Sequence, residues 1–336
     1  MSSGSSSSRP GSSRPGEDAL IARYFAPHAG PAGLGLRDDA ALLTPPPGCD
    51  LVLTTDALVA GVHFFADDPP ASIARKALRV NLSDLAAKGA APLGFLLSLA
   101  LPPDWTEPWL AAFAGALGAD GAAFGCPLAG GDTVRTPGPL TLSITAFGAV
   151  PAGRMAARSG VRPGDRLYVT GAIGDAAIGL VLRQGRGPVI PEPERGFLVG
   201  RYLEPQPRVA LAAAMAAHAN GGMDVSDGFV GDLTKMLAAS GATADVAVDR
   251  VPLSPAARAA IDADPGLFAV ALTRGDDYEI LASVPPAQVA AFEAAAAAAG
   301  VPVASFGEAA AGGAPPRFVG PDGGAIAFAE TSYNHF

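Results

Sequence analysis

The chain has 336 residues, 49% of them hydrophobic, and a net charge of −9. This length allows about two domains with a sizeable core, and the acidic balance argues against nucleic acid as the main partner. No unbroken apolar run is long enough for a membrane span, and the N-terminus lacks the apolar segment of a signal peptide. The two cysteines, Cys49 and Cys126, match no zinc-site spacing. We therefore expect a cytoplasmic protein that binds neither membranes nor nucleic acid.

Residues 1–16 are almost entirely Ser, Gly, Pro and Arg, a composition that cannot bury apolar surface, and we expect a disordered tail. Residues 17–150 then show the periodicity of a first domain with a roughly β-α-β-α-β order. Its expected helices span residues 17–26, 70–88 and 105–124, and its expected strands span residues 51–56, 93–101 and 140–150.

Pro151 and Gly153 mark the start of a second α/β domain, residues 151–336. Its Gly- and Pro-rich stretch at 184–196 is typical of a mobile surface loop, and the aromatic end at 333–336 is expected to dock back. The expected strands span residues 164–171, 223–225 and 244–248, and the expected helices span residues 174–182, 209–219, 227–239, 255–261 and 288–299.

The motif Gly130-Gly131-Asp132-Thr133 lies between two apolar runs, where a plain turn is the simplest interpretation. Its glycines would also let the backbone approach a bulky anion, and its aspartate could hold a cation. The functional interpretation gains weight because similar acidic clusters recur at residues 38–39, 54–56, 81–84, 224–228 and 275–277. An acidic site assembled from many loops suits a nucleotide enzyme that uses several magnesium ions.

Carboxylates are ligands that Mg²⁺ prefers, although any single aspartate in such places is more simply a helix cap or turn residue. The sequence contains no phosphate loop of the Gly-x-x-x-x-Gly-Lys type, so arginine, backbone amides or metal must hold any phosphate. The candidate carboxylates are Asp39, Asp56, Asp84, Asp132 and Asp224.

Three further features allow both a functional and a structural interpretation. Residues 224–228 form a strand-to-helix junction, where the amides of the helix start would face an anion unless a Ser or Asp of the segment caps them. Arg158 could bind a phosphate through two parallel hydrogen bonds, or it could be solvated. His63 could donate as a neutral ring to a substrate phosphate, or it could be a structural histidine.

Taken together and in this order, the motifs resemble the thiamine-monophosphate kinase family, part of the superfamily that includes aminoimidazole ribonucleotide synthetase. The resemblance covers about residues 17–336, and its motifs are specific in combination. The matching stretches are Leu20–Phe25, Arg37–Leu43, Thr54–Phe64, Lys76–Gly89, Gly130–Thr133, Arg158–Gly160, Pro163–Asp165, Asp224–Gly228, Gly275–Glu279 and Tyr333–Phe336.

The resemblance implies a two-domain α/β (α+β) subunit, each domain a sheet with helices on one side, and a homodimer whose N-terminal sheets join into a barrel. It implies ATP-dependent phosphorylation of thiamine monophosphate to thiamine diphosphate, the last step in the synthesis of that cofactor. The implied magnesium ligands are Asp39, Thr54, Thr55, Asp56, Asp84, Asp132, Asp224 and Asp227. The implied ATP contacts are Gly131, Asp132, Arg158 and Ser226, and the implied substrate contacts are His63, Asp276, Tyr333 and Glu330.

The chain departs from the family pattern at three positions. Arg37 stands where the family usually has Gly before the paired aspartates, and Asp276 stands where it usually has Glu. Glu330 aligns with an aromatic that packs on the substrate ring, a role that Phe328 or Tyr333 would have to take over. Our hypothesis for the mechanism is direct in-line phosphoryl transfer without a phosphoenzyme. Asp132 and Arg158 are the expected catalytic residues, and metals together with Arg158 would offset the repulsion between the two anions.

Two other functions stay open on the sequence alone. The nearest alternative is another ATP-using synthetase of the same superfamily. A selenophosphate enzyme would want a reactive cysteine near the N-terminus, whereas the first cysteine here is Cys49, after the acidic pair Asp38-Asp39. The alternative from a different class is a non-catalytic nucleotide or divalent-cation sensor.

Overall fold

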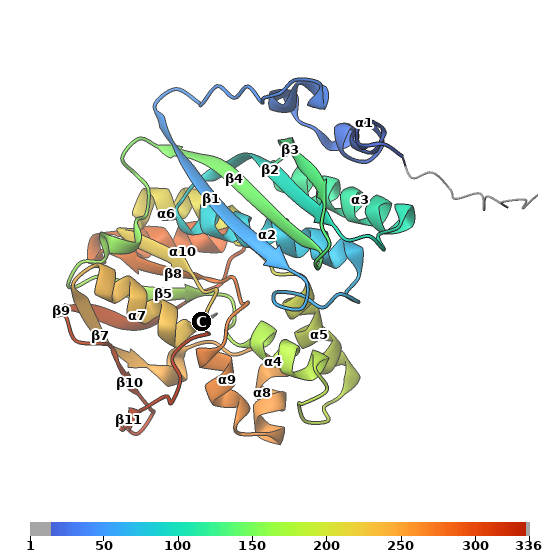
Figure 1. The fold of residues 1–336 in the computed structure, drawn as a ribbon. Helices are drawn as coiled ribbons and strands as arrows, with labels where there is room; N and C mark the ends of the chain where they lie inside the picture. The colour runs from blue at the N-terminus through green and yellow to red at the C-terminus, as the bar shows by residue number, and fades with distance from the viewer. Residues whose placement is uncertain (1–14, 334–336) are drawn as a thin grey trace, which may run out of the picture.

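The computed structural model describes residues 15–333, which form two β-sheets with helix α2 (Pro70–Ala87) between them (Figure 1). Most of the expected tail at 1–16, and the last three residues of the aromatic end at 333–336, lie outside the described residues. Within residues 15–333, no helix has the length and apolar character that crossing a bilayer requires.

The N-terminal sheet has the strand order β1-β4-β2-β3, so β1 and β3 are its two edges. Strands β1 (Cys49–Val59) and β2 (Ala91–Leu101) flank β4 (Thr141–Pro151) in antiparallel pairing, and β3 (Leu128–Arg135) runs parallel to β2. More buried and less buried residues alternate along most of β1 and β4, which places one side of each strand in the core.

Helices α2 and α3 (Glu107–Ala123) cover one face of this sheet (Figure 1). The Thr106 hydroxyl caps α3 by accepting a 3.3 Å hydrogen bond from the Trp109 amide. Arg79 of α2 donates two hydrogen bonds, of 2.6 and 3.1 Å, to the Asp120 carboxylate of α3. The two helices are therefore fixed to each other as well as to the sheet.

The opposite face of the N-terminal sheet is exposed, and we call it the open face. Its apolar side chains include Leu53 of β1, which is 65% exposed, and Val134 of β3, which is 49% exposed, together with the partly exposed Leu51 and Leu96. Contiguous apolar patches of this kind mark interaction surfaces on soluble proteins. The open face is thus a candidate for contact with another chain.

The second sheet has the strand order β11-β10-β7-β9-β5-β8-β6. Its strands contribute to a hydrophobic core separate from that of the N-terminal sheet. Its strands are β5 (Arg166–Thr170), β6 (Gly221–Asp224), β7 (Ala242–Ala247), β8 (Ile280–Val284), β9 (Val303–Ala311), β10 (Arg317–Val319) and β11 (Ala325–Ile326).

Helices cover both faces of the second sheet. Leu167 of β5 packs in the core of α7 (Phe229–Ala239), whereas its neighbour Tyr168 packs in the core of α6 (Ala212–His218) and α10 (Val289–Ala298). The expected arrangement with helices on one side is therefore wrong for this sheet, because consecutive residues of β5 and β8 are buried on opposite faces.

Several elements differ from the sequence prediction. The expected loop at 184–196 gives way at Glu192 to helix α5 (Glu192–Leu203), which packs beside α4 (Asp175–Arg183) through the buried Leu198. Helices α8 (Pro255–Ala263) and α9 (Leu267–Thr273) complete that cluster, and α9 was not predicted. The first helix is confirmed, as α1 (Glu17–Leu20) followed by a π-helical turn, Ile21–Phe25.

Candidate active site

A cavity of about 640 Å³ lies between the two sheets, and we call it the substrate cavity. Its wall comes from β1, the turn after β1, α2, α4, α9, the segments 226–227 and 274–278, and the C-terminal end. The volume is typical of small-molecule sites. The predicted site residues that line it are Asp56, His63, Ser226, Asp227, Asp276 and Tyr333.

An acidic cluster, Asp56, Asp84 and Asp224, joins β1, α2 and the end of β6 beside this cavity. The Thr54 hydroxyl donates a 2.5 Å hydrogen bond to the Asp84 carboxylate. Burial, and then the charge of Asp84, raises the pKa of Asp56 to about 6. The same two causes raise the pKa of Asp224 well above its usual value. The folded chain thus holds carboxylates close enough to disfavour each other's ionisation.

Lys88 supplies a positive charge behind the acidic cluster. Its ammonium donates a 2.7 Å hydrogen bond to the Gly222 carbonyl, and burial lowers its pKa, opposed first by Asp224. Arg158 also contributes to lowering the pKa of Lys88, which places its guanidinium on this side of the cluster. Arg158 is exposed at the start of the short helix η4 (Arg158–Gly160), and its phosphate-binding role stays a prediction.

The acidic cluster suits Mg²⁺ in the chemistry of its donors. Carboxylate oxygens are hard ligands, and Mg²⁺ usually adds water and substrate phosphates to one or two of them. Among residues 15–333, however, no three His, Cys, Asp or Glu side chains already converge as one metal site. The eight predicted magnesium ligands are therefore not brought together by a single chain.

Asp132 lies on the other side of the N-terminal sheet from Asp56. Asp56 of β1 pairs across the sheet with the buried Ile144 of β4. This row of cross-strand neighbours continues through Leu97 of β2 to Gly131 of β3, on the face that α2 covers. Side chains alternate along a strand, so the adjacent row, which ends at Asp132, belongs to the open face.

Thr55 shares the open face with Asp132, since it neighbours Asp56 on β1 and accepts a 3.0 Å hydrogen bond from Thr145. Asp39 is exposed in a bend that precedes β1.

The Gly-Gly-Asp motif is part of β3 and not the turn that the sequence allows. Gly131 has φ = 153°, and a Cβ there would lie 1.9 Å from the Leu97 carbonyl oxygen. Close packing of β3 on β2 is therefore sufficient reason for glycine at this position. Contact between Gly131 and ATP stays a prediction.

The three amides of the turn before α7 already have a hydrogen-bond acceptor. The Asp232 carboxylate accepts hydrogen bonds from the backbone N–H groups of Ser226, Asp227 and Gly228, at 3.0, 2.8 and 3.2 Å. Lys235 pairs with Asp227 at 2.6 Å and with Asp232 at 3.0 Å. Of the two interpretations that the sequence allows, the described structure favours the capped one for the amides of residues 226–228, because a carboxylate from the first turn of α7 accepts their hydrogen bonds. The role of Ser226 in binding ATP stays a prediction.

Asp276, in the wall of the substrate cavity, is hydrogen-bonded to two segments that are distant in the sequence. The Asp276 amide donates to the Ser226 carbonyl at 2.9 Å, and Asp276 has a positive φ of 74°. Its carboxylate accepts a 3.0 Å hydrogen bond from the buried Lys76, whose ammonium lies 3.8 Å from the centre of the Tyr202 ring. Sequence reasoning missed Lys76 and Asp232, although an isolated lysine in a buried helix face is a usable signal.

Neutral His63 would carry its proton on Nε2, because its Nδ1 atom accepts a 3.0 Å hydrogen bond from the Val59 amide. This tautomer suits the predicted donor role toward a phosphate oxygen, since the ring lines the substrate cavity. The donor role itself stays a prediction.

The three residues of the C-terminal segment that are candidates for contacting the substrate ring lie in different surroundings. Tyr333 lines the substrate cavity, and its amide donates a 3.0 Å hydrogen bond to the Asp227 carbonyl. Phe328 instead packs edge-on against Phe318, with ring centres 5.5 Å apart. Glu330 forms an ion pair with Arg274. Of these three candidates Tyr333 is the one that lines the substrate cavity, and its contact with a bound ring stays a prediction.

Comparison with known proteins places this arrangement in a family. Residues 37–150 match the AIR synthase related protein, N-terminal domain, and residues 162–317 match the AIR synthase related protein, C-terminal domain. A thiamine-monophosphate kinase from Caulobacter vibrioides is 45% identical over 305 residues, which span 89% of this chain and 85% of that protein. This chain belongs to the thiamine-monophosphate kinase family.

Solved structures of thiamine-monophosphate kinases share its fold. The enzyme from Stenotrophomonas maltophilia is 37% identical, with a TM-score of 0.78 over 87% of this chain and 91% of that one. AaThiL complexed with AMPPCP and TMP is 27% identical, with a TM-score of 0.76 over 87% of this chain and 89% of that one. The expected family and the two-domain α/β fold are therefore confirmed.

Replacing Asp56 by Asn should stabilise this kinase in metal-free buffer containing EDTA. The folded pKa of about 6 exceeds the usual 3.8, so the ionised carboxylate costs stability above pH 6, and the cost disappears as the pH falls toward 4. At 1.36 kcal/mol per pKa unit, the gain at neutral pH reaches up to about 3 kcal/mol. Urea unfolding at about pH 7.5 and pH 4 measures it. An unchanged or lower unfolding free energy at pH 7.5 would contradict it.

Proposed function

We propose that this chain transfers the γ-phosphoryl group of ATP to thiamine monophosphate, yielding thiamine diphosphate and ADP. The observation that carries the proposal is the substrate cavity, where His63, Asp276 and Tyr333 line one space that Asp56 of the acidic cluster also reaches. The family relationship agrees with it, since AaThiL is complexed with AMPPCP and TMP. The acceptor would lie in the cavity and the nucleotide polyphosphate beside the cluster.

The transfer demands alignment more than proton removal. A phosphate oxygen of thiamine monophosphate is already ionised, so the main obstacles are the repulsion between two anions and their in-line placement. Lys88 and Arg158 bring positive charge to the side of the acidic cluster. His63 and Lys76 line the substrate cavity, where each can donate to the acceptor phosphate.

We further propose that Asp56, Asp84 and Asp224 bind Mg²⁺ together with the phosphates of ATP. The Thr54 hydroxyl orients Asp84 for this role, and Asp227 lies at the edge of the same cavity. The ions would neutralise developing charge on the transferred group. Thr55, Asp132 and Asp39 belong to the same implied set of magnesium ligands, but they could join the acidic cluster only if elements of another chain brought them close to it.

A homodimer would bring those elements together. β1 and β3 are the open edges of the N-terminal sheet, and unpaired edges readily bind strands of another chain. Pairing β3 of one protomer with β1 of its partner would close the barrel, bury the open face and set Asp132 beside the partner's Thr55, which directly precedes Asp56 of that protomer's acidic cluster. In this proposal residues 17–150 bind metal and nucleotide and form the dimer, and residues 151–336 complete the substrate cavity.

We also place the kinase in the cytoplasm. Both cysteines, Cys49 and Cys126, are free thiols, which agrees with a reducing compartment.

The function is tested by measuring ADP release with purified protein, ATP, Mg²⁺ and a panel of acceptors. We expect turnover with thiamine monophosphate, none with thiamine or aminoimidazole ribonucleotide precursors, and loss of turnover in excess EDTA. Mass spectrometry should identify thiamine diphosphate as the product. Turnover only with a purine precursor would favour a related synthetase, and nucleotide binding without turnover would favour a sensor.

The dimer proposal predicts complementation between two inactive variants. Asp132→Asn and Asp56→Asn should each lower turnover by at least about tenfold, or roughly 1.4 kcal/mol in barrier. A mixed dimer, purified through two different tags, would contain one intact site and should recover about half of the wild-type rate. If Asp132 served the site of its own chain, both sites of the mixed dimer would be damaged and no recovery would be seen.

The substrate ring should be held by Tyr333. A thiazolium cation gains about 0.5–2 kcal/mol from an aromatic face, so Tyr333→Ala should raise the KM for thiamine monophosphate severalfold and leave the KM for ATP unchanged. Phe328→Ala is the matched control, because that ring packs on Phe318 and should affect stability instead. A KM increase in Glu330→Gln alone would show that the carboxylate pairs with the cation in place of the aromatic contact.

A further inference from the structure

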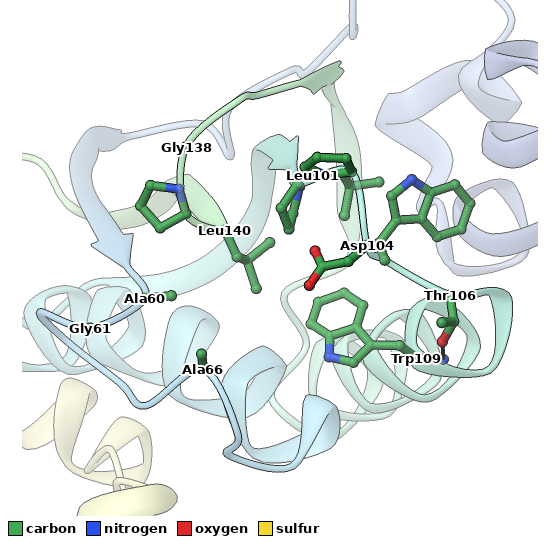
Figure 2. A pocket seen from close by; sticks show the side chains of 13 residues that line it. Ala60, Gly61, Ala66, Leu101, Asp104, Thr106, Trp109, Gly138 and Leu140 are labelled. Carbon is green, nitrogen blue, oxygen red and sulfur yellow. Dashed lines mark hydrogen bonds between the residues drawn. The ribbon is translucent and has the colours of Figure 1, made fainter.

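A second cavity, of about 590 Å³, opens at the end of the N-terminal sheet, where β1 and β2 finish and β4 begins (Figure 2). We call it the tryptophan cavity. Its wall shares no residue with that of the substrate cavity, although the two are adjacent along the chain: Ala60 and Gly61 line one, and Val62 and His63 line the other. Neither the family relationship nor the proposed phosphoryl transfer gives this space a role.

The lining combines aromatic faces with one negative charge. Both tryptophans of the chain, Trp105 and Trp109, belong to it. The carboxylate of Asp104 projects into the space between Trp109 and Leu140 (Figure 2). Stacking on Phe113, with ring centres 5.2 Å apart and planes 13° apart, fixes the Trp109 indole. The aromatic surface is therefore formed before any ligand arrives.

The charged groups that line this cavity favour a positively charged ligand over a negatively charged one. No lysine, arginine or histidine lines it, and within residues 15–333 the Asp104 carboxylate accepts no hydrogen bond and forms no ion pair. An anionic ligand would meet Asp104 without a compensating group, whereas a cation would gain a carboxylate partner and an indole face together.

We propose that the tryptophan cavity binds a flat organic cation that carries no phosphate. Indole is the best aromatic partner for a delocalised or quaternary cation, and the apolar wall of Leu101, Leu140 and Pro139 accommodates the rest of a ring system. Thiamine has this chemistry, whereas the phosphate of thiamine monophosphate would be repelled by Asp104. The choice of thiamine rests on the proposed function, but the class of ligand does not.

The two tryptophans make the test specific. In protein labelled with ¹⁵N-tryptophan, both indole N–H resonances come from this cavity, and neither tryptophan lines the substrate cavity. Titration with thiamine, and separately with benzyltrimethylammonium, should shift both resonances saturably. Benzyl alcohol, which is uncharged, and thiamine monophosphate should bind at least about tenfold more weakly, a difference of roughly 1.4 kcal/mol. Saturation by benzyltrimethylammonium alone would support the cation site and reject thiamine as its ligand.

Asp104→Asn should weaken binding of either cation at least about fivefold while preserving the two-resonance spectrum of the folded protein. Asp249→Asn removes the same charge from an exposed position near the second sheet and should leave binding unchanged. Saturable shifts of equal affinity in Asp104→Asn, or equal affinity for benzyl alcohol, would overturn the proposal. So would an absence of shifts with both cations, the result expected if a second copy of the chain fills the cavity.

Discussion

Helix α2 must lie buried between two sheets and still carry charge, and the site depends on how that conflict is resolved. Lys76, Asp84 and Lys88 recur at multiples of four residues, which places them on one face of the helix. An isolated buried charge costs several kcal/mol, so each needs a partner from another element. Lys76 donates a hydrogen bond to the Asp276 carboxylate, and the Asp84 carboxylate accepts one from the Thr54 hydroxyl. Lys88 donates a hydrogen bond to the Gly222 carbonyl. These contacts fix the helix against both sheets at once.

The same helix also carries a buried polar atom that has no hydrogen-bond partner among the described residues. Asn81 is fully buried on α2, and its amide nitrogen donates a 3.0 Å hydrogen bond to the Ala77 carbonyl. Its side-chain oxygen has no hydrogen-bond partner in the described part of the chain. Buried polar atoms without partners are rare in folded proteins and expensive. Together with the carboxylates that raise each other's pKa, this indicates that the polar groups beside the substrate cavity are held there at a cost in stability.

Sequence patterns were sufficient for most of the N-terminal fold because its strands alternate and its helices are long. They failed at β3, because two glycines argue against a strand, and only the contact with the Leu97 carbonyl explains them. Helix α5 and strand β9 were missed for a related reason. The two glycines of α5 and the alanines of β9 have weak local preference, so packing against α4 and pairing with β5 and β7 decide their conformation.

The sequence singles out the aspartates of the candidate site, but it does not show how they group in space. Adjacent residues of a strand point to opposite faces, so the side chains of Thr55 and Asp56 lie on different sides of the sheet. Only the register reveals that Asp132 shares the face of Thr55. Likewise, no local pattern shows that Asp232 would occupy the amides before α7. In the proposed dimer the two groups of predicted ligands come from different protomers, so the assembled site would depend on protein concentration.

The turn at residues 60–63 contributes to the walls of both cavities, two residues to each. It is anchored on one side by the Val59 amide, which donates to the His63 ring, and it passes through Gly61 with φ = 84°. A ligand that shifts this turn in one compartment also changes the shape of the other. By thermodynamic reciprocity, the factor by which an occupant of the first compartment alters affinity in the second equals the factor in the opposite direction. The change in either affinity when the other compartment is filled therefore measures how strongly these four residues couple the two compartments.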